Sequence, residues 1–250
     1  MALPFSARFA IVALLSSAAF GAGYSFRGGS AGEANVGPDA TSSRKTVDDF
    51  HVLYYESLND TWNNTYWLGV RTLKLPLDLW IFQEIIYATK PDVIVEAGTY
   101  NGGSALFMAS LLDTIGKGRV ITIDIEDFPG KPRHDRITYL IGSSTADEIV
   151  GKVRSLIGED DTVMVVLDSD HHAEHVLNEL RIYGEMVTTG NYLIAEDTNV
   201  NGHPVQPEFG AGPSEAVQTF LKDNHAFAVD AKREKFLFTF NPGGYLIRVR

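Results

Sequence analysis

The chain has 250 residues, 44% of them hydrophobic and 21% charged, and carries a formal net charge of −11. This length fits one α/β domain with a short extra segment, and the apolar fraction is sufficient for a core. The negative charge argues against a nucleic-acid partner, because phosphate binding needs a basic face. The sequence has no cysteine, which excludes disulfides, thiolate metal sites and cysteine nucleophiles.

The N-terminus differs in composition from the rest. Arg8 precedes an apolar run at 9–15, and residues 16–23 are small or apolar. This pattern predicts a signal peptide or a retained N-terminal anchor at 1–23, and both stay open because no clear Ala-x-Ala cleavage motif is present. A disordered or misassigned start is a third alternative. With a signal peptide or an anchor, the protein is expected to be exported or anchored in a membrane. Without either, it is expected to be cytoplasmic. Residues 24–46, rich in Gly, Ser and Ala, predict a flexible linker.

Beyond the linker, residues 47–250 alternate between helical and strand patterns. Helices are expected at 46–58, 77–89, 104–114, 146–156, 173–187 and 214–223. Strands are expected at 93–95, 119–125, 137–141, 162–167, 192–195, 236–240 and 245–249. The last two strands are joined by Asn241-Pro242-Gly243-Gly244, a turn signal that predicts an antiparallel hairpin. The order predicts an α/β fold with a Rossmann-like doubly wound sheet, mostly parallel, that ends in this C-terminal antiparallel hairpin.

A glycine-rich turn follows the first of these strands. Its spacing is Gly-x-x-x-Gly-Gly, so the dinucleotide fingerprint Gly-x-Gly-x-x-Gly is absent. Glu96 at the strand end suits a cationic amino-acid ligand, and Asp124 at the next strand end is placed to accept hydrogen bonds from ribose hydroxyls. The alternative is that the glycines only serve the turn. The candidate cofactor-binding residues are Glu96, Gly98, Thr99, Tyr100, Gly102, Gly103, Ser104, Asp124 and Ser143.

Acidic side chains follow two later strands. Asp168 directly follows the strand expected at 162–167, and Glu196 and Asp197 directly follow the strand expected at 192–195. Neighbouring parallel strands end side by side, so these carboxylates are expected to converge, and like charges this close need a counter-charge. An oxygen-rich set suits a hard cation such as Mg²⁺, with His171 as general base. For Asp170, capping of the next helix is an equal alternative.

Two other metal patterns occur in the same region. Residues 171–175 read His-His-Ala-Glu-His and match the H-x-x-E-H pattern of inverted zinc peptidases, but no third ligand is evident. Residues 197–208 satisfy the spacing of an EF-hand calcium loop, yet prolines fall where the exiting helix should begin. We therefore favour the carboxylate cluster over both.

Several motifs in order resemble those of the cephalosporin hydroxylase and rhamnosyl O-methyltransferase family, across about residues 47–250. They are Trp67-Leu68-Gly69, Pro76-Leu77-Asp78, residues 95–98 with 102–105, residues 168–171, residues 196–199, residues 210–213 and residues 240–246. The resemblance implies a class I methyltransferase domain that uses S-adenosylmethionine, with Mg²⁺ or another divalent cation held by Asp168, Glu196 and Asp197. It also implies an Asp-x-x-His pattern in which His171 is the base. The sequence departs from many methyltransferases at 142–144, where an acidic residue often contacts adenine.

The leading hypothesis is a metal-assisted O-methyltransferase that acts on a hydroxyl of a sugar, a glycolipid or a small natural product. A lid over the acceptor is expected from residues 47–75 and 199–213, with Trp62, Tyr66, Trp67 and His203 as candidate lining. One rival is a cephalosporin-hydroxylase-like oxygenase or accessory subunit, although Fe(II) oxygenases usually use two His and one carboxylate. A second rival is a non-catalytic cofactor-binding domain. The acceptor, a membrane association through the N-terminus and a homo-oligomer are left open.

Overall fold

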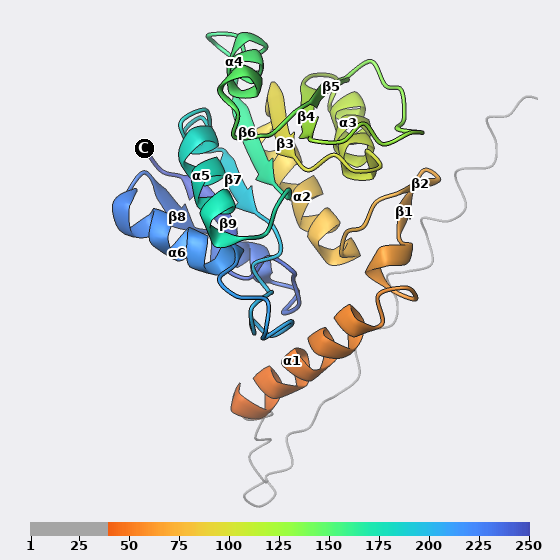
Figure 1. The fold of residues 1–250 in the computed structure, drawn as a ribbon, viewed down its shortest axis with the longest axis vertical. Helices are drawn as coiled ribbons and strands as arrows, with labels where there is room; N and C mark the ends of the chain where they lie inside the picture. Colours follow the sequence, from red (N-terminus) through yellow and green to blue (C-terminus); the bar gives the residue numbers. More distant parts are fainter. Residues whose placement is uncertain (1–39) are drawn as a thin grey trace, which may run out of the picture. The chain divides into compact units, whose positions relative to one another are not determined.

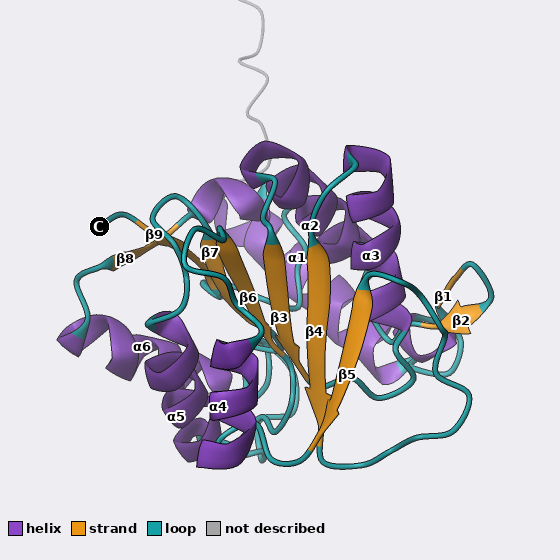
Figure 2. Ribbon diagram, turned by 90° about the horizontal axis from the view of Figure 1, so that it is seen from above, coloured by secondary structure: helices purple, strands orange, loops and turns teal. Residues whose placement is uncertain are grey.

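Seven strands form the central sheet in the order β5-β4-β3-β6-β7-β9-β8 (Figures 1 and 2). The computed structural model describes residues 40–250, which form one compact unit. The parallel strands are β3 (Val93–Ala97), β4 (Arg119–Asp124), β5 (Ile137–Ile141), β6 (Val163–Leu167) and β7 (Tyr192–Ala195). Each of these five strands was predicted, and the doubly wound, mostly parallel fold is confirmed.

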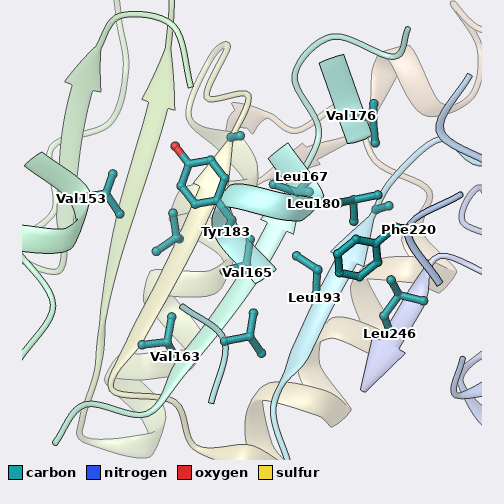
Figure 3. Close-up of a cluster of buried hydrophobic side chains, with 14 of the residues drawn as sticks. Val153, Val163, Val165, Leu167, Val176, Leu180, Tyr183, Leu193, Phe220 and Leu246 are labelled. Atoms are coloured by element: carbon teal, nitrogen blue, oxygen red, sulfur yellow. The ribbon is translucent and has the colours of Figure 1, made fainter. Parts of the chain in front are cut away.

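Helices cover both faces of this sheet (Figure 2). One face carries α2 (Pro76–Thr89) and α3 (Gly103–Ile115), and the other carries α4 (Asp147–Ser155), α5 (Ala173–Gly184) and α6 (Pro213–Asp223). Because the inner strands are buried on both faces, they read as nearly continuous Val/Ile/Leu runs rather than as alternating patterns. Figure 3 shows β6 and β7 side chains packed against Leu180 and Tyr183 of α5.

The C-terminal part differs from the predicted hairpin. β9 (Tyr245–Arg248) pairs antiparallel with β7 and with β8 (Phe227–Val229), so antiparallel C-terminal strands are present. The first strand of the pair is therefore 227–229, and the predicted strand at 236–240 is wrong. Two groups of that segment are held by Asp78 of α2: the Phe240 amide donates to Oδ2 at 2.9 Å, and the Thr239 hydroxyl donates to Oδ1 at 2.5 Å. These bonds replace a strand ladder.

The N-terminal helix α1 (Ala40–Glu56) begins inside the segment predicted as a linker, so residues 40–46 are helical instead. Its aromatic side chains pack against Phe238 and Phe240. Short elements that were not predicted follow: the 3-10 helices η1 (Trp62–Asn64) and η2 (Ala231–Glu234), and the hairpin β1 (Tyr66–Trp67) and β2 (Val70–Arg71).

The predicted signal peptide or anchor at 1–23, and the linker up to residue 39, lie outside the described residues. Within residues 40–250, no helix is both long enough and apolar enough to span a bilayer.

Candidate active site

A cavity of about 840 Å³ opens at the carboxyl ends of the parallel strands. It is lined by the turn after β3, by the residues that follow β4, β5 and β6, and by Asp197 after β7. In an open parallel sheet these ends form the crevice in which ligands bind. The cavity therefore joins the predicted cofactor region and the predicted acidic cluster in one space.

Most of the candidate cofactor residues face this cavity. Its lining includes Gly98, Thr99, Tyr100, Gly103, Ser104, Asp124 and Ser143. Gly102 is not in the lining. It precedes α3 in the left-handed region at φ 75°, and a Cβ there would lie 2.9 Å from the Tyr139 hydroxyl. The contribution of Gly102 is therefore to the turn, because a residue with a Cβ is strained in this conformation.

Two features of position 98 require glycine. The backbone lies at φ 99°, and a Cβ would come within 1.9 Å of the Asp168 carbonyl oxygen. This close approach brings the ends of β3 and β6 together. Asp124 is fixed by two amides, since Oδ2 accepts from Tyr100 N at 2.8 Å and Oδ1 accepts from Glu126 N at 3.0 Å. Each carboxylate oxygen has a further lone pair for a ligand hydroxyl.

Glu96 is placed differently from the prediction. Its side chain is buried beneath the cavity rather than in the lining, and both oxygens accept from hydroxyls: Ser104 Oγ at 2.5 Å and Thr122 Oγ1 at 2.6 Å. Burial raises the pKa of Glu96 to about 7, and these two hydrogen bonds oppose the rise. Glu96 thus tethers Ser104 at the start of α3, and its contact with a ligand is not direct.

The acidic cluster forms where β6 and β7 end. Asp168, His171 and Asp197 can each offer one ligand atom within 4.8 Å of one another. His171 Nε2 lies 3.2 Å from Asp197 Oδ2, and Asp197 has a left-handed backbone at φ 53°. A non-glycine residue held in this region is a form of strain that clusters at functional sites. The predicted convergence of Asp168 and Asp197 is therefore present in the geometry.

Lys74 is the residue that sequence reasoning missed. Its side chain is buried, and its Nζ pairs with Asp168 and, at 2.7 Å, with Glu196 Oε1. Burial lowers the pKa of Lys74, but the two ion pairs outweigh burial and raise it above its usual value. The sequence carried one signal, a single lysine between Leu73 and Leu75, together with the requirement that clustered acids have a counter-charge.

Glu196 lies deeper than the other two acids and is absent from the cavity lining. Burial raises its pKa well above the usual value, with Lys74 opposing the rise and Asp168 adding to it. Burial likewise raises the pKa of Asp197, while His171 opposes this shift. Burial is the main cause of both shifts and the negative charge of Asp168 adds to them, and a cation bound here would oppose both effects.

The donor set fits a hard divalent cation. Lys74 balances one of the three carboxylates, which leaves about two negative charges for a single divalent ion. Carboxylate oxygens are the ligands that Mg²⁺ prefers, and the cluster holds one histidine, His171. The two-histidine, one-carboxylate set of Fe(II) oxygenases is not formed by these residues, which does not favour the oxygenase rival.

The remaining motifs separate in space. His171 faces Asp197, whereas His175 lies 3.3 Å from Glu179, so the two histidines of the H-x-x-E-H pattern do not share a centre. The EF-hand reading of 197–208 fails because the next helix begins only at Pro213. Asp170 accepts from the His172 amide at 2.8 Å and so closes the turn before α5.

Only some of the residues predicted for the lid line the cavity. Trp62 and, from 199–213, Val200, Gln206 and Phe209 line the cavity. Trp67 instead donates to Ser110 Oγ at 2.8 Å, and Tyr66 is also outside the lining. His203 pairs with Glu215 at 2.9 Å. Tyr55, which lies in the predicted lid segment 47–75, and Phe240, which lies outside both predicted segments, complete an aromatic wall.

Comparison with known proteins identifies the family of this chain. The family model described as Rhamnosyl O-methyltransferase/CmcI covers residues 59–249. A rhamnosyl O-methyltransferase of Mycobacterium leprae (strain TN) is 39% identical over 208 residues, which cover 81% of this chain and 90% of that protein. A rhamnosyl O-methyltransferase of Mycobacterium tuberculosis (strain ATCC 25618 / H37Rv) is 36% identical over 213 residues, which cover 82% of this chain and 86% of that protein.

Solved structures agree on the fold. Apo CmcI superposes with a TM-score of 0.59 at 22% identity, over 75% of this chain and 77% of that chain. CmcI with Mg and SAM superposes with a TM-score of 0.56 at 23% identity, over 75% and 78%. At these identities the likeness supports the fold, and the family rests on the sequence matches. The chain belongs to the rhamnosyl O-methyltransferase/CmcI family and is an S-adenosylmethionine-dependent O-methyltransferase of the class I fold.

Proposed function

We propose that this enzyme methylates a hydroxyl of a sugar, in a glycolipid or a small glycoside, and that it does so with a divalent cation such as Mg²⁺. The observation that carries the proposal is the single cavity shared by the cofactor turn and the acidic cluster. The relatives named rhamnosyl O-methyltransferase support a sugar acceptor. The solved CmcI structure with Mg supports the cation.

The chain's own residues divide the work. Asp124 receives the ribose hydroxyls of the cofactor, which fixes the sulfonium near the acidic cluster. Tyr55, Trp62 and Phe240 offer aromatic faces that suit the apolar face of a sugar ring. Holding both substrates in line for attack on the methyl group accounts for much of the rate enhancement.

His171 is the proposed base. It takes the proton of the acceptor hydroxyl at Nδ1, the hydroxyl oxygen bonds to the methyl carbon, and the bond from carbon to sulfur breaks to leave S-adenosylhomocysteine. Asp197, whose Oδ2 lies 3.2 Å from the other ring nitrogen, Nε2, orients the ring and stabilises the imidazolium. A divalent cation would be held by Asp168, Glu196 and Asp197, and its positive charge would lower the pKa of the acceptor hydroxyl.

Calorimetry tests the cofactor and the cation separately. S-adenosylmethionine is titrated with and without Mg²⁺ into the wild type, Asp168→Ala and the control Asp160→Ala, an exposed aspartate outside the cavity. We expect the wild type and the control to bind both ligands and Asp168→Ala to lose the Mg²⁺ site. A wild type that binds no cofactor contradicts the whole proposal, and a wild type without a Mg²⁺ site contradicts the metal role.

The acceptor is tested by transfer of a labelled methyl group to a rhamnose-bearing glycolipid. His171→Ala is expected to lower kcat about 10²–10⁴-fold while cofactor affinity is kept. An anchor or signal at 1–23 and a homo-oligomer remain predictions.

A further inference from the structure

A buried carboxylate lies behind the end of the cavity formed after β5 and β6. Glu179 of α5 is fully buried, and its Oε1 accepts from Ser144 Oγ at 2.5 Å and from Ser169 Oγ at 2.7 Å. Ser144 and Ser169 line the cavity, whereas Glu179 does not. The carboxylate therefore acts on the cavity through these two hydroxyls and through His175, which also lines the cavity.

Two further groups hold this arrangement in place. His175 Nε2 lies 3.3 Å from Glu179 Oε1 and 3.2 Å from Ser144 Oγ, and the Tyr183 hydroxyl donates to the Ser144 carbonyl at 2.7 Å. Hydrogen bonding to Glu179 raises the pKa of His175, as expected for an imidazole N–H that faces a carboxylate. Protons from three sides thus point towards Glu179.

The direction of these hydrogen bonds determines what the cavity end can recognise. A serine hydroxyl has one proton and two lone pairs, and an ionised carboxylate only accepts. Because Ser144 and Ser169 both give their proton to Glu179, each can offer only a lone pair to the cavity. A ligand group at this position must therefore be a hydrogen-bond donor.

The layout of the cavity identifies the part of the cofactor that reaches this end. The sulfonium has to lie near Asp168 and Asp197, and Asp124 receives the ribose. The adenine ring of the cofactor must then lie against the lining residues that follow β4 and β5. Here Ile125, 70% exposed, offers an apolar surface for the face of an aromatic ring, and Ser144 lies at the edge.

We infer that Glu179 is a positioning residue that, by aligning the hydroxyls of Ser144 and Ser169 as acceptors, makes this end of the cavity select the exocyclic amine of adenine. The inference rests on the proposed cofactor and deepens it. It also explains how selection is achieved although residues 142–144 carry no acidic side chain. The carboxylate is supplied from α5 and acts through the serines.

The test compares two ligands that differ at this group. Dissociation constants of S-adenosylhomocysteine and S-inosylhomocysteine, in which a carbonyl replaces the amine and the adjacent N1 carries a proton, are measured by calorimetry. We expect the wild type to prefer the adenine ligand at least about tenfold, the effect of one well-placed hydrogen bond. Glu179→Leu frees both hydroxyls to rotate and donate, so its preference is expected to fall to about threefold or less. Glu179→Gln, whose amide oxygen can still accept, is expected to keep most of the preference.

The controls separate positioning from folding. Glu174→Leu makes the same change at an exposed site on α5 outside the cavity, and it should leave the preference unchanged. Should Glu179→Leu fail to fold, the double variant Ser144→Ala/Ser169→Ala takes its place, with the same expected loss. A folded variant that keeps the wild-type preference overturns the inference alone. A wild type that binds neither ligand overturns the proposed cofactor and the inference with it.

Discussion

Lys74 is the residue on which the charge balance of the acidic cluster depends. Its ammonium group is buried between Asp168 and Glu196. Removing one partner of a buried ion pair leaves uncompensated charge and costs about 3–5 kcal/mol. Because a divalent cation is proposed at the same carboxylates, the ion can compensate for a lost lysine. Lysine and metal are then alternative sources of positive charge.

This dependence predicts the behaviour of Lys74→Met. In EDTA the variant is expected to lose about 3 kcal/mol of unfolding free energy, and Mg²⁺ is expected to restore most of it. Urea unfolding with and without Mg²⁺ measures both effects. The matched control is Lys90→Met, an exposed lysine at the end of α2. A loss that Mg²⁺ leaves unchanged would contradict this account.

Glu96 predicts a pH dependence of stability. Burial raises its pKa from 4.5 to about 7, so the folded state keeps a proton that the unfolded chain has released. This contribution to stability is complete below about pH 4.5 and is lost as the pH rises through about 7. Glu96→Gln, which does not titrate, is expected to gain about 2 kcal/mol relative to the wild type between pH 5 and pH 8.

Urea unfolding of both proteins at the two pH values measures this difference, since other titrating groups are common to both. Glu159→Gln, an exposed change in the turn before β6, should show no such difference. If the free energy of unfolding changes with pH in the same way for Glu96→Gln and the wild type, the buried carboxylate of Glu96 is not the cause of the pH dependence.

At the scale of elements, α2 holds the C-terminal segment that otherwise reads as a strand. Asp78 in the first turn of α2 accepts from Thr239, Phe240 and, at 2.9 Å, the Tyr245 hydroxyl. Phe240, held in this way, packs against α1 and also lines the cavity. One carboxylate thus connects α2, β9 and the aromatic wall of the site.

Asp78→Ala leaves these buried donors without an acceptor. The free energy of unfolding is expected to fall by about 2–4 kcal/mol, and amide exchange at Phe240 is expected to accelerate by at least about tenfold. Hydrogen exchange resolved by residue measures the second effect. Glu84→Ala, a surface ion-pair partner on the same helix, should cost about 1 kcal/mol or less. Equal losses of unfolding free energy for the two variants would contradict the role of Asp78 in holding this segment.

The elements also show where sequence reasoning succeeds. β3, β6 and β7 are short, mostly apolar runs bounded by turn residues, so local pattern alone identifies them. The segment 236–240 has the same local appearance, but its hydrogen-bond partner is Asp78, far away in the sequence. Periodicity carries no information about such a partner, and the strand was predicted wrongly for that reason.

At the scale of the whole molecule, the cofactor would connect the ends of β3, β4 and β6 and so stabilise the folded state. A ligand at 100 times its dissociation constant adds about 2.7 kcal/mol, which raises Tm by about 5–10 °C for a domain of this size. S-adenosylmethionine is expected to produce this shift in the wild type and to lose most of it in Asp124→Ala. Thermal unfolding monitored by calorimetry measures both.

Asp127→Ala provides the control for this experiment, because Asp127 is an exposed aspartate in the same loop and lies outside the cavity. A wild type whose Tm does not move at saturating cofactor would contradict the assignment of the cavity.

Local sequence patterns were sufficient to predict the five parallel strands, the glycine turn, and the placement of Asp124, Asp168 and Asp197 at the carboxyl ends of those strands. These features follow from local patterns combined with the rule that parallel strands end at one edge. Only the tertiary structure decided the burial of Glu96, the counter-charge from Lys74 and the carboxylate of Glu179 behind the serines. Each depends on a side chain from a distant segment entering a desolvated space, and the energy of that contact is not encoded in the local spacing of residues.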